Sequence, residues 1–240
     1  MAMSLKYSSP PIKAIIFDLD GTLYSQRILR RAMLGRIAKE YAFHPLEGIN
    51  ALRILQAYRG AHERLRGIET TEDLSLLQLK LASHRIGVSV ETVSYYVLRW
   101  MEQEPLKLLA KAIYPYELEF LAAAKANGIR MAVLSDYPAP AKLRALGIDH
   151  YFEMATCAQD PEINCLKPNE KGLRTVLGRL GVKASEALYI GDRPEVDQVA
   201  ASRAGIACAI IRQKPASYKS GMESVTYEYL LKALAENRIV

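Results

Sequence analysis

One pattern recurs four times in the second half of this 240-residue chain: a helix-like stretch, a glycine with an apolar residue after it, and soon afterwards a strand-like run. Each such glycine can take the left-handed conformation that ends a helix, and the next apolar residue can pack back against that helix. The glycines are Gly128, Gly147, Gly181 and Gly205, and the runs that follow them are 130–135, 151–157, 187–191 and 208–212. Together with the apolar run 12–18, this alternation predicts an α/β fold, a doubly wound parallel sheet of five strands with helices on both faces.

Two acidic residues, Asp18 and Asp20, end the first apolar run and precede Gly21 and Thr22. Side chains two residues apart on an extended chain point the same way, so the two carboxylates are expected to lie together. Such a pair is costly unless a cation lies between the carboxylates or one of them keeps a proton. Ligands of open parallel sheets bind at the carboxyl ends of the strands, which is where this pair lies. The pair therefore predicts a cation site with an acid or base beside it.

Four motifs in order along the chain resemble the signatures of the haloacid dehalogenase (HAD) superfamily, most of whose members are phosphatases. They are Asp18-Leu19-Asp20-Gly21-Thr22, Val133-Leu134-Ser135-Asp136, Leu166-Lys167-Pro168, and Tyr189-Ile190-Gly191-Asp192 followed by Asp197. The resemblance covers most of the chain outside residues 26–112. It implies a Rossmann-like core with the strand order 5-4-1-2-3, in which the strand that carries Asp18 is central.

Residues 26–112 break the alternation and have helical periodicity throughout. An apolar stripe at helical spacing comprises Val93, Tyr96, Val97, Trp100 and Met101. Helix caps are expected at Ser89 and at Thr70 or Thr71, and Trp100 is expected to pack in a core rather than to contact substrate. An insertion at this point resembles the helical type-1 cap of the family. The predicted domains are therefore a core of residues 1–25 and 113–240 and a cap of residues 26–112, with hinges near 23–26 and 114–115.

The resemblance implies a role for each acidic residue of the motifs. Asp18 is the expected nucleophile, which forms an aspartyl-phosphate. Asp20 is the expected acid and base: it protonates the leaving alcohol, later takes a proton from water, and offers its backbone carbonyl to the metal. Crowding by Asp18 is expected to let Asp20 hold a proton near neutral pH. Asp18, Asp20 and Asp192 are the expected Mg²⁺ ligands, and Asp197 is expected to support the metal's waters or the ammonium of Lys167.

The resemblance also implies which polar residues of these motifs bind the phosphate group of the substrate. Thr22 and Ser135 are expected to donate hydrogen bonds to phosphate oxygens. Lys167 is expected to match the charge of the phosphate and of the transition state and to restrain Asp18. Asp136, next to Ser135, is expected to be a turn residue.

The net charge of +6 is concentrated in residues 26–112, which hold fourteen Lys and Arg against nine Asp and Glu. A basic segment beside an acidic site suits an anionic substrate, here a small phosphorylated metabolite. Arg27, Arg30 and Arg31 share one helix face by their spacing. At least one of them is expected to face the cleft and to contact the leaving group of the substrate.

Several other classes of protein are not expected. The chain has no nucleic-acid-binding motif, no apolar run near the ~20 residues of a membrane span and no signal-peptide pattern at its N-terminus. Its three cysteines lack CxxC spacing, which is typical of reduced thiols and predicts a cytoplasmic location. The sequence leaves the oligomeric state open.

The sequence predicts a Mg²⁺-dependent phosphatase that hydrolyses a small-molecule phosphate monoester through an aspartyl-phosphate. A 2-haloacid dehalogenase is the first alternative, but the family's dehalogenases typically lack the second acid, whereas this chain has Asp20 together with Lys167 and Asp192. A sugar-phosphate mutase would use the same residues, and a non-catalytic regulatory protein could have inherited the fold. The sequence leaves the choice between phosphatase and mutase open, as well as the identity of the substrate.

Overall fold

The sheet has five parallel strands in the order β3-β2-β1-β4-β5, so the strand that carries Asp18 is central, as predicted. The computed structural model describes residues 11–212 and 224–236. The strands are β1 (Ala14–Phe17), β2 (Arg130–Ser135), β3 (Met154–Cys157), β4 (Ala187–Gly191) and β5 (Ala207–Ile210). Within the central strand, Ile16 pairs with Ala132 of β2 on one side and with Tyr189 of β4 on the other. The doubly wound α/β fold is confirmed.

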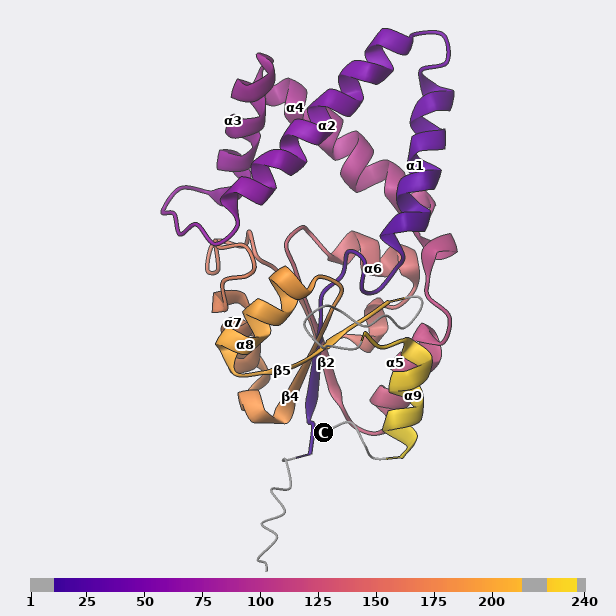
Figure 1. Ribbon diagram of the computed structural model, residues 1–240, viewed down its shortest axis with the longest axis vertical. Helices are drawn as coiled ribbons and strands as arrows, with labels where there is room; N and C mark the ends of the chain where they lie inside the picture. The colour runs from indigo at the N-terminus through magenta and orange to yellow at the C-terminus, as the bar shows by residue number, and fades with distance from the viewer. Residues whose placement is uncertain (1–10, 213–223, 237–240) are drawn as a thin grey trace, which may run out of the picture.

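Helices cover both faces of the sheet. Since alternate residues of β1 point to opposite faces, the strand contributes to a buried cluster on each side. Ile15 and Phe17 belong to one buried cluster, and Ala14 and Ile16 belong to another. The first cluster draws on α5 (Glu117–Ala126), α6 (Pro140–Leu146) and α9 (Tyr227–Ala235), and the second on α7 (Lys171–Leu180) and α8 (Val199–Ala204). Figure 1 shows α5 and α9 on one side of the strands and α7 and α8 on the other.

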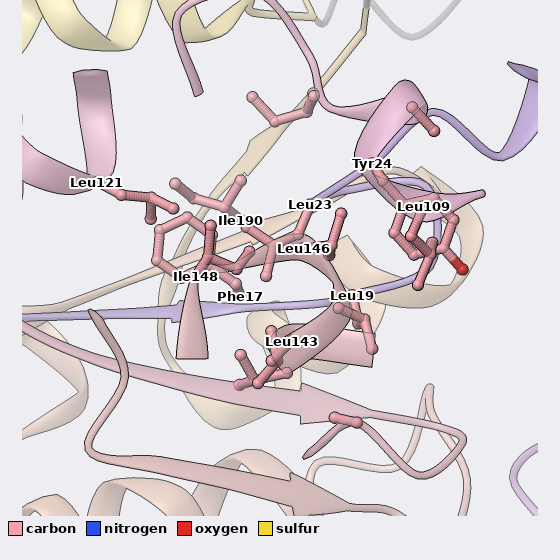
Figure 2. Packing of buried hydrophobic residues seen from close by; sticks show 14 of the residues in the cluster. Phe17, Leu19, Leu23, Tyr24, Leu109, Leu121, Leu143, Leu146, Ile148 and Ile190 are labelled. Carbon is pink, nitrogen blue, oxygen red and sulfur yellow. The ribbon is translucent and has the colours of Figure 1, made fainter. Parts of the chain in front are cut away.

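Large apolar side chains fill the first cluster, where the ring centroids of Phe17 and Phe120 lie 6.4 Å apart in an edge-to-face arrangement. Figure 2 shows this cluster, including Phe17, Leu143 and Ile190. Because these residues are fully buried beneath the end of β1, they hold in place the backbone that carries Asp18.

Left-handed glycines end the repeated helices as predicted, with φ angles of 72° at Gly128, 72° at Gly147, 61° at Gly181 and 74° at Gly205. Three strands are shorter than the predicted ranges. The first strand, predicted at 12–18, is Ala14–Phe17. β3 begins only at Met154, because Asp149–Tyr151 form a 3₁₀ turn. The last strand, predicted at 208–212, is Ala207–Ile210.

Residues between β1 and β2 form the predicted helical insertion. It contains α1 (Gln26–Glu40), α2 (Pro45–Leu65), α3 (Leu74–Ile86) and α4 (Val90–Val97), followed by a π-helical stretch, Leu98–Gln103, and 3₁₀ turns at Glu104–Lys107 and Leu109–Ala112. Figure 1 shows α1 to α4 gathered together at one end of the sheet. Ser89 caps α4 as predicted, and Trp100 is buried as predicted. The expected cap at Thr70 or Thr71 is wrong: α3 is capped by the Asp73 carboxylate, which accepts the Leu76 N–H at 2.8 Å.

The apolar pattern of residues 225–235 predicts a last helix with Tyr227, Leu230, Leu231 and Leu234 facing inward. In the structure α9 buries three of these side chains, and Leu231 is partly buried against the same cluster. The sequence also predicts a loop at 214–222, which lies outside the described residues. None of the helices in the described ranges combines the length and the apolar character that a membrane span requires.

Candidate active site

A cavity of about 630 Å³ lies at the carboxyl ends of β1 and β4, between the sheet and the inserted helices. Six of the residues predicted to form the site line it: Asp18, Asp20, Arg30, Lys167, Asp192 and Asp197. The other predicted residues, Thr22, Arg27, Arg31 and Ser135, are not among its lining residues. The strand ends thus bring together side chains that are up to 179 residues apart in the chain.

The Lys167 ammonium is the central cation of the site. Its Nζ donates to Asp18 Oδ1 at 2.6 Å, to Asp197 Oδ1 at 2.7 Å and to the Tyr189 hydroxyl at 3.0 Å. Burial alone would lower the pKa of Lys167, but the carboxylates of Asp18 and Asp197 outweigh it and raise the pKa well above its ordinary value. The lysine is therefore charged, and the predicted contact between Lys167 and Asp18 is present.

Three carboxylates, those of Asp18, Asp192 and Asp197, have oxygens within 4.8 Å of one another. The second oxygen of Asp18 accepts the Thr22 hydroxyl at 2.9 Å. Burial raises the pKa of Asp18 to about 6 despite Lys167. Burial, followed by the charges of Asp18 and Asp197, raises the pKa of Asp192 to about 8. One ammonium thus leaves the cluster with excess negative charge.

That excess charge and the all-oxygen donor set fit a divalent cation such as Mg²⁺. Asp192 is the residue best placed to ligate it, because its carboxylate receives no hydrogen bond from any of the described residues. Asp18 is the natural second ligand. Asp197 has other partners: its Oδ2 accepts the backbone N–H groups of Asp192 at 3.1 Å and of Arg193 at 2.9 Å, so it orients the turn that carries Asp192.

Gly21 explains why the first motif needs a glycine. Its φ is +109°, and a Cβ at this position would lie 2.2 Å from Asp192 Oδ2. Only glycine combines this backbone conformation with so close an approach. The backbone of the first motif is thereby pressed against the carboxylate of the fourth.

Asp20 occupies a different environment from the other acids. Its carboxylate accepts two hydrogen bonds from Lys142 Nζ, at 2.6 and 2.9 Å, and one from the Tyr24 hydroxyl. Its backbone carbonyl, the predicted metal contact, accepts the Gln26 side-chain amide at 2.8 Å. Burial raises the pKa of Asp20, but Lys142 and Tyr24 together outweigh burial and lower the pKa below its ordinary value. The expectation that crowding by Asp18 would keep Asp20 protonated near neutral pH is wrong, because Lys142 compensates its charge.

Lys142 was not anticipated from the sequence. It lies in α6, the helix that follows β2, and only 9% of its surface is exposed. A lysine in the first turn of the helix after the second motif is the one signal that could have indicated it, since that helix begins near the carboxyl end of its strand.

A second unpredicted set of contacts, centred on Arg66, connects the inserted helices to Asp136 and to the backbone of Lys167. Arg66, just after α2, donates from Nη1 to Asp136 Oδ2 at 2.6 Å and to the Lys167 backbone carbonyl at 3.0 Å. Asp136 Oδ1 accepts the Lys167 backbone N–H at 3.2 Å. Asp136 lies in the bend that follows β2, in agreement with its expected place in a turn, and it is in addition a buried carboxylate with charged partners. No local pattern could have found a pair separated by 70 residues.

Some of the residues predicted to bind phosphate or substrate line the cavity, and others do not. The Ser135 hydroxyl is buried and accepts the Tyr137 N–H at 3.2 Å. Of the four arginines on α1, only Arg30 lines the cavity. Arg59 of α2, which the sequence analysis did not single out, also lines it, and burial and the neighbouring Arg30 lower its pKa. Two cations from different helices therefore border the same space.

The chain matches the family model described as haloacid dehalogenase-like hydrolase over residues 12–205. It is 28% identical to a glyceraldehyde 3-phosphate phosphatase of Methanopyrus kandleri, with 84% of each chain covered. It is 30% identical to a phosphoglycolate phosphatase of Rhodospirillum rubrum, over 83% of this chain and 79% of that one.

Solved structures share the fold. A HAD phosphatase from Thermococcus onnurineus has a TM-score of 0.57 at 18% identity, over 95% of this chain and all of the other. A 2-haloacid dehalogenase from Pseudomonas syringae has a TM-score of 0.60 at 20% identity, over 94% of this chain and 97% of the other. Because the family model spans most of the chain and the four motifs meet in one cavity, the protein belongs to the haloacid dehalogenase-like hydrolases.

Proposed function

We propose that this protein is a Mg²⁺-dependent phosphatase that hydrolyses small phosphate monoesters through a phosphorylated Asp18. The single observation that supports this most is the environment of Asp18, a buried carboxylate held between Lys167 and Thr22 beside an acidic group suited to a cation. Relatives named as phosphatases of glyceraldehyde 3-phosphate and of phosphoglycolate support the same class of reaction.

Asp18 is suited to nucleophilic attack because its orientation is fixed. Lys167 binds one oxygen at 2.6 Å and Thr22 binds the other at 2.9 Å, so little reorganisation precedes attack on phosphorus. The covalent intermediate divides the reaction into two easier steps. Bound Mg²⁺, held by Asp18 and Asp192, would neutralise part of the charge that the carboxylates and the phosphate bring together.

The pair of Asp20 and Lys142 handles protons in both steps. In the first step the leaving alkoxide needs a proton, which Asp20 delivers from its protonated form; this is the minor form at neutral pH, because Lys142 lowers the pKa of Asp20. In the second step the ionised Asp20 carboxylate, the form that its lowered pKa favours, takes a proton from the attacking water. The proton lost in the first step is thereby regained in the second.

Residues 26–112 act in this proposal as a cap domain that keeps water out of the site. Two ion pairs connect them to the catalytic segments: Arg66 with Asp136, and Glu63 with Arg193 at 3.0 Å. Asp136 belongs to the second motif and Arg193 directly follows Asp192 of the fourth, so closure of the cap and order in the site are coupled.

The test is turnover of p-nitrophenyl phosphate with Mg²⁺ and then with EDTA. Chelation should abolish activity, and Asp18→Asn should do the same, whereas Asp149→Asn, at an exposed aspartate, should not. Borohydride reduction during turnover should convert the acyl phosphate at Asp18 to homoserine, which mass spectrometry detects. A fully active Asp18→Asn variant would falsify the nucleophile assignment.

The alternatives predict other products. A dehalogenase would release chloride from a 2-haloacid without metal, and a mutase would isomerise a sugar phosphate without releasing phosphate. Appearance of either product in place of free phosphate would exclude the proposed hydrolysis.

Arg30 is the cap residue proposed to contact the leaving group, because it alone of the four α1 arginines lines the cavity. Arg30→Ala should raise KM for phosphate esters by about tenfold, the loss expected for one charged hydrogen bond. Arg27→Ala and Arg31→Ala, at exposed positions outside the cavity, are matched controls. An unchanged KM in Arg30→Ala would remove this residue from the substrate site.

A further inference from the structure

The cavity continues away from the acidic cluster along a wall of apolar side chains. This wall comes from α1, α2 and the segment around the end of α4, and includes Met33, Ile37, Leu52, Leu55, Val97 and Trp100. None of these residues belongs to the four catalytic motifs. The catalytic acids and the apolar wall therefore line one continuous space with two chemically different ends.

Part of this wall consists of apolar side chains that the protein itself leaves uncovered. Leu34 is 55% exposed and Leu52 is 40% exposed, and both line the cavity. Apolar surface in contact with water is unfavourable, and covering it with an apolar group is favourable in proportion to the area buried. Trp100, which also lines the cavity, has an indole N–H without a hydrogen-bond partner among the described residues.

The size of the cavity indicates what could cover the wall. A volume of about 630 Å³ lies within the range of pockets that enclose drug-sized ligands. A two- or three-carbon phosphate ester, such as those in the names of the relatives, would occupy the acidic end and leave most of the wall wet. The wall suits a longer molecule that has its phosphate at one end and an apolar portion at the other.

We propose, resting on the phosphatase function above, that the leaving group of the substrate carries an apolar body of several carbons that packs against Leu34, Leu52 and the rest of this wall. The substrate is then an amphipathic phosphate monoester rather than a small polar sugar or acid phosphate. Binding energy from the apolar body holds the phosphate against Asp18, which raises kcat/KM.

The test is a series of n-alkyl phosphates from ethyl to octyl, used below their aggregation concentrations. The leaving alcohols have nearly the same pKa, so the chemical step is constant and only the apolar contact changes. Each methylene that reaches the wall should raise kcat/KM by about three- to fourfold. The rise should stop once the wall is covered. A flat series would overturn the inference and leave the phosphatase function standing.

Variants locate the contact. Leu34→Ser combined with Leu52→Ser should lower the octyl-to-ethyl ratio of kcat/KM by at least about tenfold, since each change removes apolar contact area. The matched control combines Ile28→Ser with Ile49→Ser, at positions on the same two helices that are 40% and 55% exposed but lie outside the cavity. An equal ratio in the two double variants would overturn the proposed wall.

Binding separates this inference from the proposed reaction. The affinity of octylphosphonate relative to ethylphosphonate, measured by calorimetry with the Asp18→Asn variant, requires no turnover. Tighter binding of the longer ligand that is lost in the leucine double variant supports the apolar wall. Absence of turnover with every ester, p-nitrophenyl phosphate included, would refute the phosphatase proposal and with it the substrate assigned here.

Discussion

Glu117→Gln should make the protein more stable at alkaline pH. Glu117 is fully buried in α5, at the point where the chain returns from the inserted helices to the core. Its Oε2 accepts the Tyr114 N–H at 3.0 Å, and its Oε1 has no hydrogen-bond partner among the described residues. Burial raises its pKa from 4.5 to about 8. The carboxyl is therefore mostly neutral in the folded protein at pH 7.

The magnitude follows from the two pKa values. Each pKa unit corresponds to about 1.4 kcal/mol, so the difference between 4.5 and about 8 corresponds to about 5 kcal/mol. The folded state binds the proton more tightly than the unfolded state, so the free energy of unfolding falls as pH rises. The stabilisation is complete below pH 4.5 and is lost as pH rises to about 8. Glutamine keeps an acceptor for Tyr114 and cannot ionise, so this loss disappears.

Urea unfolding at pH 5 and at pH 8.5 measures the effect. The variant and the natural protein should have similar free energies of unfolding at pH 5, and the variant should be more stable by about 3 to 5 kcal/mol at pH 8.5. Glu119→Gln, at an exposed position of the same helix, should show no such pH-dependent gain. A difference for Glu117→Gln that stays within about 1 kcal/mol across this range would refute the idea that the buried carboxyl is held neutral.

Three further changes test the site. Lys142→Met should raise the pKa of Asp20 and lower kcat by about 100-fold. The limb of the pH–rate profile that reports ionisation of Asp20 should move to higher pH, and an unshifted limb would contradict the pairing of Asp20 with Lys142. Gly21→Ala should displace the Asp192 carboxylate and lower kcat/KM by about 100-fold. Calorimetry should show a reduced affinity for Mg²⁺, and an unchanged affinity would contradict the close approach of Gly21 to Asp192. Arg66→Ala should destabilise the protein by about 3 kcal/mol in urea unfolding, and Arg66→Lys by less; equal stability of all three proteins would contradict the buried ion pair.

The fold could be predicted largely because its signals are local. A glycine that ends a helix acts within one turn, and alternation of strands and helices restricts the sheet to parallel pairing. Prediction failed where several local signals compete. Thr70, Thr71 and Asp73 can each cap a helix, and the local pattern does not choose among them. Asp73 caps α3 in place of the expected threonines, and the Leu74 N–H at the start of this helix is bound by the side chain of Asn164, which is 90 residues away. No local pattern contains that contact.

The candidate site divides in the same way. Asp18, Lys167 and Asp192 could be found because each lies at the end of a strand in a recognisable motif, and the parallel sheet brings strand ends together. Lys142 and Arg66 were not predicted, because a charged residue on a helix or at its end is most often at the surface. Their burial depends on how the helices dock on the sheet, which the sequence pattern leaves unspecified.

The two acids of the first motif have opposite electrostatic environments although they are two residues apart. Asp18 shares Lys167 with Asp197, so burial, followed by the charge of Asp197, raises the pKa of Asp18 to about 6. Both hydrogen bonds of the Lys142 ammonium go to Asp20, and the pKa of Asp20 is lowered. Environments that shift the pKa values of two carboxyl groups in opposite directions suit the two groups to different chemical roles. The group with surplus negative charge is the one that a cation and an electrophile stabilise, which suits a nucleophile. The group with its own ammonium stays ionised without help from a metal, which suits the base that activates water.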